Sequence, residues 1–357
     1  MRKLGRAAQK RGFACYVNYF KKVKDMKISI LGCGRWGSFI AWYQATVLKN
    51  EVTLCGEEGR IAYDELVANR ANEYVKLDDS IELTSDLGYA LSKSDIIIIS
   101  ISSQALREYM QKVVSHPVQD KTFVLCMKGI EVSTGKRLSE ILIESGIKKE
   151  KIAVWVGPGH IQEFTRGVPN CMIVDAYDEN LKQEIAEKFK SSLIRFYYGN
   201  DIIGTEIGAA AKNVLGIAAG VLDGSGYQSL KGPLMARGAF EVGTLIAAMG
   251  GKFNSAYGLA HLGDYETTLF SVHSHNRTYG EMMAKGHKFE KLAEGVMTAK
   301  AMKELGDKYG IELPITHAVY EACFVSNPFE DGDGANNCMN LILKLFDREI
   351  KPEFYKK

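Results

Sequence analysis

Short apolar runs alternate with longer amphipathic stretches along the first half of the chain. The apolar runs predict strands, and apolar residues recurring every three or four positions predict helices. Strands and helices in alternation form a mainly parallel sheet with right-handed crossovers. The pattern therefore predicts a doubly wound α/β domain over residues 27–198, with strands at 27–31, 52–55, 81–83, 94–101, 122–127, 152–156, 172–174 and 194–197 and helices at 36–48, 104–114 and 180–191.

Beyond residue 199 the apolar positions keep only the helical period. This second half predicts an all-α C-terminal domain over residues 199–350. We expect it to close over the sheet domain, with a cleft between the two. Its predicted helices span 202–222, 232–249, 276–285, 290–309, 314–326 and 332–347.

The helix predicted at 202–222 carries a stripe of four glycines, at positions 204, 208, 216 and 220, with Lys212 midway along it. Each glycine costs a helix interior about 1 kcal/mol relative to alanine, so the stripe needs a reason. We expect the glycines to leave room for a ligand beside Lys212, whose amine would be buried and chemically active. The alternative is a tight helix–helix contact with a lysine that extends to water.

The first predicted strand runs into Gly32-Cys-Gly-Arg-Trp-Gly37 and then into a helix, which is the context of a dinucleotide-binding turn. Gly32 permits the tight turn, Gly34 lets the backbone approach a pyrophosphate, and Gly37 lets the helix pack on the strand. Free N–H groups at the helix N-terminus then bind the phosphates. The sequence therefore predicts a Rossmann-like nucleotide site.

Glu57 lies twenty residues after Gly37, at the end of the second predicted strand. A carboxylate there accepts a hydrogen bond from a ribose 2′-hydroxyl and repels a 2′-phosphate. We therefore expect the cofactor NAD, with NADH favoured over NADPH, although Arg60 softens the preference. The alternative is an exposed acid that caps the next helix.

Charge is unevenly distributed along the chain. Residues 1–25 carry eight basic residues and one acid, so the 45 basic and 43 acidic residues of the whole chain become 37 and 42 without this extension. The acidic body argues against a nucleic-acid partner. We expect the basic extension to be loosely ordered, and its docking on an anionic membrane surface is a further hypothesis.

Composition also bears on metals and on location. The seven cysteines form no CxxC pair and no His/Cys metal spacing, and His261, His273, His275 and His287 do not share one face, so we predict no metal site. Cysteines inside apolar runs fit a reducing, cytoplasmic location. No apolar run approaches the ~18 residues of a membrane span, so we expect no stable membrane insertion.

Nine short segments, spread over about residues 27 to 345, occur in the same order as the motifs of a known enzyme family. They resemble the motifs of the NAD(P)-dependent glycerol-3-phosphate dehydrogenases of the soluble bacterial type. The segments are Gly32–Gly37, Ser102–Arg107, Lys128–Glu131, Gly157-Pro158, Arg166–Pro169, Lys212–Val214, Gly258–Asp264, Asn276-Arg277 and Glu294-Gly295.

The resemblance implies reversible reduction of dihydroxyacetone phosphate to sn-glycerol 3-phosphate, a supply of glycerol phosphate for phospholipid synthesis. It implies that Lys212 is the catalytic acid, with Asp264 orienting it and Lys128 as a second cation. The substrate-binding residues it implies are Lys128, Gly157, Asn213, Ser274, His275 and Asn276. Besides the three glycines and Glu57, the implied cofactor-binding residues are Arg35, Trp36, Lys128, Ile161, His275 and Glu294.

Three departures from the family pattern stand out. His275 replaces the usual arginine, Gly159 replaces a hydroxyl or amide side chain, and the segment 72–77 is shortened. Histidine is a weaker, pH-dependent cation, so Arg277 or Lys128 would have to compensate at the substrate phosphate. The alternatives are a dehydrogenase for another small phosphorylated or acidic ketone, or a nicotinamide-binding regulator without turnover. A homodimer is a further expectation.

Overall fold

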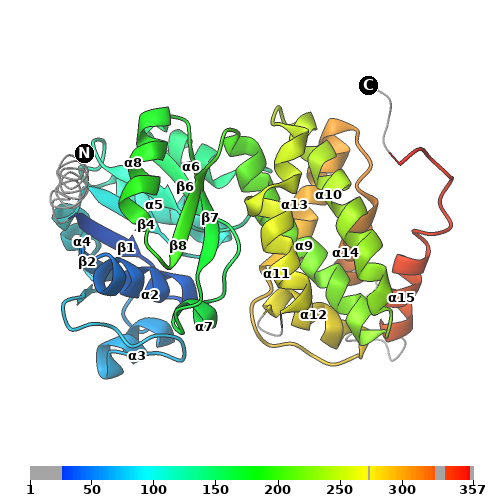
Figure 1. The fold of residues 1–357 in the computed structure, drawn as a ribbon, viewed down its shortest axis with the longest axis horizontal. Coiled ribbons are helices and arrows are strands. Elements are labelled where there is room, and N and C mark those ends of the chain that lie inside the picture. Colours follow the sequence, from blue (N-terminus) through cyan, green and yellow to red (C-terminus); the bar gives the residue numbers. More distant parts are fainter. Residues whose placement is uncertain (1–25, 272–273, 326–333, 354–357) are drawn as a thin grey trace, which may run out of the picture.

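The computed structural model describes residues 26–271, 274–325 and 334–353, so the predicted basic extension and His273 lie outside the described residues. A sheet with helices on both faces forms one side of the molecule (blue to green), and a cluster of helices forms the other (green through yellow to red; Figure 1). The predicted α/β sheet followed by a helical C-terminal part is confirmed.

The sheet has the strand order β3-β2-β1-β4-β5-β6-β7-β8. Its neighbouring strands are parallel except for β6 and β7, which are antiparallel. The strand order reverses between β1 and β4, and ligands of such sheets bind beyond the carboxyl ends of the strands at this point. The strands are β1 (Lys27–Leu31), β2 (Glu51–Cys55), β3 (Glu82–Thr84), β4 (Ile96–Ile99), β5 (Thr122–Leu125), β6 (Ile152–Val156), β7 (Asn170–Ala176) and β8 (Ile194–Tyr198).

The helices of the sheet part include several that the sequence pattern did not predict. Four of them, α3, α4, α6 and α7, have nine residues or fewer, so too few apolar positions repeat for the helical period to be recognised. The predicted helix 36–48 is an α-helix that ends in a π-helical turn at Tyr43–Val47. The helices are α2 (Arg35–Trp42), α3 (Ile61–Asn69), α4 (Leu87–Lys93), α5 (Leu106–Val114), α6 (Leu138–Glu144), α7 (Ile161–Phe164) and α8 (Glu179–Phe189).

The helical part is built around α9, in which nearly every residue is buried. Among the described residues α9 is the one helix long and apolar enough to cross a membrane, and 89% of its apolar window is buried inside the structure. It is thus the core helix of this half. The helices are α9 (Ile202–Gly224), α10 (Lys231–Ala248), α11 (Asp264–Phe270), α12 (His275–Ala284), α13 (Glu294–Tyr309), α14 (Pro314–Phe324) and α15 (Gly334–Leu343).

The glycine stripe of α9 contacts neighbouring elements rather than an open space. A Cβ added at Gly220 would lie 1.9 Å from the carbonyl oxygen of Arg277, and one added at Gly208 would lie 2.9 Å from the Cβ of His261. The expectation that the glycines leave room for a ligand is therefore wrong, because they let α12 and the 258–263 turn approach the helix. In the alternative, Lys212 extends to water. The structure differs from this as well, because only 13% of the Lys212 side chain is exposed.

Two buried carboxylates fasten the start of α9 to the sheet half, Glu206 to the start of α6 and Asp175 to β7. Glu206 accepts hydrogen bonds from Arg137 Nη1 at 2.6 Å and from the backbone N–H and hydroxyl of Ser139 at 2.8 and 2.6 Å. Asp175, on β7, accepts from the hydroxyl of Thr205 at 2.8 Å. The position of Lys212, less than two turns further along α9, is therefore fixed relative to the sheet.

Candidate active site

A cleft of about 1070 Å³ lies beyond the carboxyl ends of the parallel strands and reaches α9, α11 and the start of α12. Of the residues predicted for the site, all but Gly37 and Gly157 line this cleft. The lining set is Gly32, Gly34, Arg35, Trp36, Glu57, Lys128, Ile161, Lys212, Asn213, Asp264, Ser274, His275, Asn276 and Glu294.

The turn after β1 has the geometry that a pyrophosphate requires. Gly32 has φ +113°, and a Cβ there would lie 2.3 Å from the Ser100 carbonyl oxygen. A Cβ at Gly34 would meet no atom within 4 Å, so its backbone faces the open cleft, and one at Gly37 would lie 1.9 Å from the Gly32 oxygen. Helix α2 begins here with no side-chain cap and no acidic residue in its first turn. The residues present therefore fit a dinucleotide.

Glu57 follows β2 at the exposed end of the cleft. Its Oε2 accepts a hydrogen bond from Arg60 Nε at 3.0 Å, and both side chains are mostly exposed. The N-cap residue of α3 is Arg60, so Glu57 does not cap the next helix as the alternative proposed. The carboxylate is thus placed to meet a ribose, with its charge partly offset by Arg60.

Two lysines share one buried carboxylate at the other end of the cleft. Lys212 Nζ lies 2.9 Å from Asp264 Oδ1, and Lys128 Nζ lies 2.5 Å from Asp264 Oδ2. Lys212 also donates to the hydroxyl of Thr268 at 2.9 Å, and Lys128 to the carbonyl oxygen of Gly157 at 3.0 Å. One lysine comes from the sheet and the other from α9, so Asp264 joins the two halves of the molecule.

This arrangement changes the acidity of the cluster. Burial lowers the pKa of Lys212 from 10.5 to about 8, although Asp264 opposes the shift. Burial would raise the pKa of Asp264, but the charges of Lys128 and Lys212 outweigh it and hold this pKa below 3.8. Burial raises the pKa of the nearby Glu294 carboxyl above 4.5. Lys212 is thus an ammonium that can lose its proton near neutral pH.

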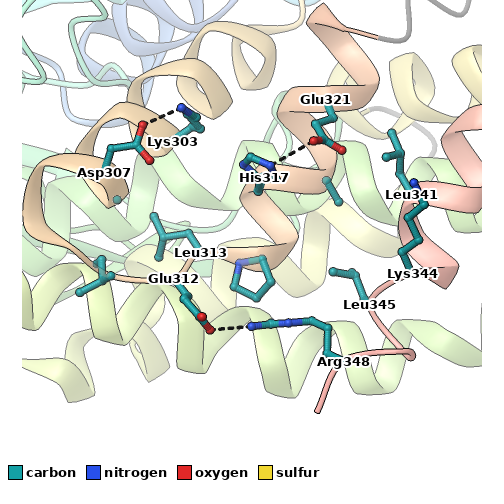
Figure 2. Close-up of a pocket in the computed structure, with 14 residues that line it drawn as sticks. Lys303, Asp307, Glu312, Leu313, His317, Glu321, Leu341, Lys344, Leu345 and Arg348 are labelled. Atoms are coloured by element: carbon teal, nitrogen blue, oxygen red, sulfur yellow. Dashed lines mark hydrogen bonds and ion pairs between the residues drawn. The ribbon is translucent and has the colours of Figure 1, made fainter.

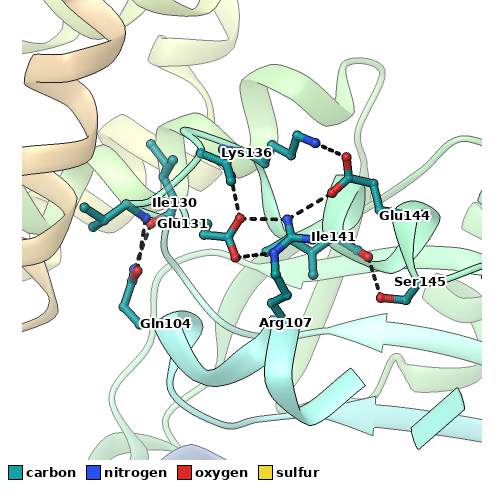
Figure 3. A network of polar contacts seen from close by, with 10 residues as sticks. Gln104, Arg107, Ile130, Glu131, Lys136, Ile141, Glu144 and Ser145 are labelled. Carbon is teal, nitrogen blue, oxygen red and sulfur yellow. Dashed lines mark hydrogen bonds and ion pairs between the residues drawn. The ribbon is translucent and has the colours of Figure 1, made fainter. Parts of the chain in front are cut away.

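A polar network fixes the loop that carries Lys128 (Figure 3). The Gln104 side chain donates to the Ile130 carbonyl oxygen at 2.8 Å and accepts from the Val132 N–H at 3.1 Å. Arg107 donates two hydrogen bonds of 2.7 Å to the carboxylate of Glu131, whose pKa it lowers. The segment after β5 is thereby held against α5, which limits the movement of the lysine.

Amide side chains connect the start of α12 to the cluster. Asn276 donates to Asn213 Oδ1 at 3.0 Å and accepts from the backbone N–H of Gly295 at 2.9 Å. Ser274 caps the helix by accepting from the N–H of Arg277. Arg277 itself donates to Asp223 Oδ2 at 2.7 Å. Asp223 is not among the residues that line the cleft, so Arg277 does not compensate for His275 as one expectation held.

Gly159 lines the cleft with φ +150°, and a Cβ there would lie 2.3 Å from a ring carbon of Phe164. A side chain of the kind usual in the family would therefore require Phe164 to move. Local packing explains this departure.

Comparison with known proteins identifies the chain's relatives. The models for the N-terminus and the C-terminus of NAD-dependent glycerol-3-phosphate dehydrogenase match residues 27–182 and 201–332. The chain belongs to this family. A glycerol-3-phosphate dehydrogenase (NAD(P)+) of Chlorobium limicola is 35% identical over 344 residues, covering 92% of this chain and 100% of the relative. One of Macrococcus caseolyticus is 33% identical over 332 residues, covering 88% and 98%.

The solved structure of glycerol-3-phosphate dehydrogenase from Coxiella burnetii aligns with a TM-score of 0.81 at 24% identity, covering 91% of this chain and 99% of that one. The fold is therefore that of the glycerol-3-phosphate dehydrogenases, and the resemblance inferred from the sequence motifs is confirmed. Members of the family use a nicotinamide cofactor, so the dinucleotide geometry of the cleft and the family agree.

The sequence patterns do not predict one polar residue of this dehydrogenase cleft, Thr268. Thr268 accepts a hydrogen bond from Lys212 and donates to the carbonyl oxygen of Asp264 at 2.8 Å. The signal was present, because Asp264 and Thr268 are four residues apart, which places them on one face if the segment is helical. The prediction placed no helix there, whereas α11 starts at Asp264.

A second hollow, of about 440 Å³, lies between α13, α14 and the segment after α15 (Figure 2). Most of its charged side chains pair with one another, as in Lys303 with Asp307 and Arg348 with Glu312. This hollow therefore offers little charge to a ligand. Within the described parts of the chain no group of three or more His, Cys, Asp or Glu side chains is placed to hold a metal ion.

Proposed function

We propose that this chain reversibly reduces dihydroxyacetone phosphate to sn-glycerol 3-phosphate with a nicotinamide cofactor. The observation that carries the proposal is the cluster of Lys128, Asp264 and Lys212 in the wall of the dinucleotide cleft. Negative charge develops on the oxygen of a ketone as it is reduced, and a buried amine stabilises that charge. The names of the relatives point to the ketone.

The bound nicotinamide supplies the hydride in one direction and accepts it in the other. Lys212 donates its proton to the ketone oxygen and takes it back in the reverse reaction. Its pKa of about 8 suits both directions, because neither protonation state is strongly disfavoured near neutral pH. Asp264 orients the amine, and Lys128 holds a second positive charge beside the same oxygen.

The substrate phosphate is assigned to the N-terminus of α12, at Ser274, His275 and Asn276. A Cβ added at Gly216 would contact both Thr268 and Asn276, at 2.9 and 3.4 Å, so this helix start lies beside the hydrogen-bond partner of Lys212. Such proximity suits a substrate with only three carbons. Asn213 completes the substrate site, and Gly157, which does not line the cleft, contributes by holding Lys128 through its carbonyl oxygen. The assigned cofactor-binding residues are Gly32, Gly34, Trp36, Gly37, Glu57, Lys128, Ile161, His275 and Glu294.

The proposed cofactor is NADH rather than NADPH. Glu57 supports this choice, because its carboxylate would face the 2′-phosphate of NADPH. Two like charges about 4 Å apart cost roughly 1–4 kcal/mol at a partly hydrated site. The ion pair with Arg60 reduces this cost without removing the carboxylate.

The decisive experiment compares the wild type with Lys212→Ala. We expect kcat for NADH oxidation with dihydroxyacetone phosphate to fall at least ~10²-fold, while the Kd of NADH changes little. Lys231→Ala is a matched control, because Lys231 is equally buried and paired, with Asp223, outside the cleft residues. Tight NADH binding with no turnover by the wild type would support the regulator alternative, and turnover of other ketones alone would support a different substrate.

The proposal extends to the cellular setting. Six described cysteines are free thiols, which supports a reducing, cytoplasmic location. We place the enzyme there as a homodimer that supplies glycerol phosphate for phospholipid synthesis. Sedimentation velocity measures the oligomeric state, and vesicle co-sedimentation with and without residues 1–25 measures membrane docking.

A further inference from the structure

The substrate phosphate has no obvious cation among the residues assigned so far. Lys128 and Lys212 both bind Asp264 and serve the ketone oxygen. Arg277 forms ion pairs with Asp223 and Glu281. Partial burial, and then the charges of Arg35 and Lys291, lower the pKa of His275 below 6.5. The imidazole is therefore mostly neutral at pH 7, and a phosphate dianion placed beside it needs positive charge from elsewhere.

Arg35 supplies a guanidinium at this place. It is the first residue of α2 and lines the cleft, and its Cζ lies 5.1 Å from the centre of the Tyr74 ring. In the described part of the chain it has no carboxylate within ion-pair distance, whereas Arg60 is paired with Glu57. Stacking on Tyr74 orients the guanidinium while leaving its N–H groups free to bind an anion.

The position of Arg35 relative to the opposite wall decides between two anions. The cofactor pyrophosphate is bound by backbone N–H groups of the turn that contains Gly32 and Gly34. The Arg35 side chain leaves this turn for Tyr74, and Arg35 lines the same cleft as His275, the first residue of α12. In agreement with this placement, the charge of Arg35 contributes to lowering the pKa of His275. Arg35 therefore adds its charge next to the N-terminus of α12, where the substrate phosphate is assigned.

We propose that Arg35, which the family resemblance implies as a cofactor-binding residue, is instead the substrate's phosphate-binding cation, contributed by the nucleotide-binding wall to an anion site completed by the N-terminus of α12. This inference rests on the proposed function, because it takes the phosphate of the substrate as its ligand. Arg35 thereby takes the place of a cation at position 275, and the site binds phosphate only when both walls contribute.

The test is Arg35→Ala with a binding measurement and a kinetic one. In the presence of saturating NAD+, sn-glycerol 3-phosphate should raise the Tm of the wild type, and this shift should be lost in the variant. kcat/KM for dihydroxyacetone phosphate should fall about ten- to a hundred-fold, as expected for loss of a charge-assisted hydrogen bond. kcat/KM for unphosphorylated dihydroxyacetone, and the Kd of NADH, should change by less than about three-fold.

Two further variants sharpen the result. Arg195→Ala is the matched control, since Arg195 also lies over a tyrosine ring, with its Cζ 5.0 Å from the centre of Tyr197, on strand β8 outside the cleft residues. It should leave every measurement unchanged. Adding His275→Arg to Arg35→Ala should restore most of the lost kcat/KM, because the second substitution returns a guanidinium from the opposite wall.

The outcomes separate the inference from the function. An unchanged kcat/KM for dihydroxyacetone phosphate, or a raised Kd of NADH as the main effect, would overturn the assignment of Arg35 while the wild-type activity still supported the function. A wild type that reduces no dihydroxyacetone phosphate would overturn the function. The Tm shift with sn-glycerol 3-phosphate, compared with glycerol, would then still decide whether Arg35 binds the phosphate.

Discussion

Replacing Asp264 by asparagine tests whether the shared carboxylate controls the proton of Lys212. Reduction of the ketone uses the ammonium form of Lys212, so its rate should fall as the pH rises through the pKa of about 8. Oxidation uses the neutral amine and should rise over the same range. The Asp264 charge raises this pKa, so its removal must lower it and move both transitions to lower pH.

The size of the effect follows from the geometry. The carboxylate oxygens lie 2.9 Å from Lys212 Nζ and 2.5 Å from Lys128 Nζ. An opposite charge at such a distance typically shifts a pKa by about one to three pH units, and Lys128, no longer neutralised, repels the second ammonium in the same direction. At pH 7.5 the protonated fraction of Lys212, and with it the rate of reduction, should fall by about three-fold to about 200-fold.

The assay is the pH profile of kcat for NADH oxidation between about pH 5 and pH 10, with saturating dihydroxyacetone phosphate. Asp307→Asn is the control, because Asp307 also forms an ion pair with a lysine, Lys303, but on the surface of α13. It should reproduce the wild-type profile. If Asp264→Asn lowers kcat equally at every pH and leaves the midpoint near 8, the carboxylate orients the lysine without setting its acidity, and the electrostatic reasoning is wrong.

Two further substitutions test the junction and the cofactor choice. Glu206→Ala should destabilise the fold by about 3–5 kcal/mol, because it leaves the buried Arg137 without its buried partner, and urea denaturation measures this loss. Glu140→Ala, which removes the more exposed partner of the same arginine, should cost only about 1 kcal/mol. Glu57→Gln should raise the ratio of kcat/KM for NADPH to that for NADH at least about five-fold, whereas Glu65→Gln on the exposed side of α3 should not change it.

The sequence predicted the parts of the fold that local pattern determines. Eight apolar runs became the eight strands, and the GxGxxG turn lies where its glycines require. The pattern did not show which neighbour each glycine of α9 contacts, because those neighbours come from α12 and from the turn at residues 258–263. A stripe of small residues indicates that another group approaches the helix closely. Only the tertiary structure shows whether that group is a ligand or another helix.

The charged residues of the candidate site show the same limit. Lys128, Lys212 and Asp264 belong to sequence motifs 52 residues or more apart, and the structure places their polar atoms within hydrogen-bond distance. Arg277 was considered as a compensating cation because it follows Asn276, but successive residues on a helix point in different directions, and its partner is Asp223. Two cations act on the pKa of His275, Arg35 and Lys291, and of these two Arg35, more than 200 residues away in the chain, lines the cleft.

The polar residues of the cleft come from two walls, so the site is complete only while the two walls are in contact. The sheet half contributes Lys128, which follows β5, and Arg35, which begins α2, and the helical half contributes Lys212 and Asp264. If the walls separated, Asp264 would lose Lys128, and the N-terminus of α12 would lose the charge of Arg35. Either loss would weaken the site on its own, because a buried charge without its partner is costly. The buried carboxylate of Glu206, which ties α9 to the start of α6 in the sheet half, therefore helps to maintain the geometry on which both groups of charges depend.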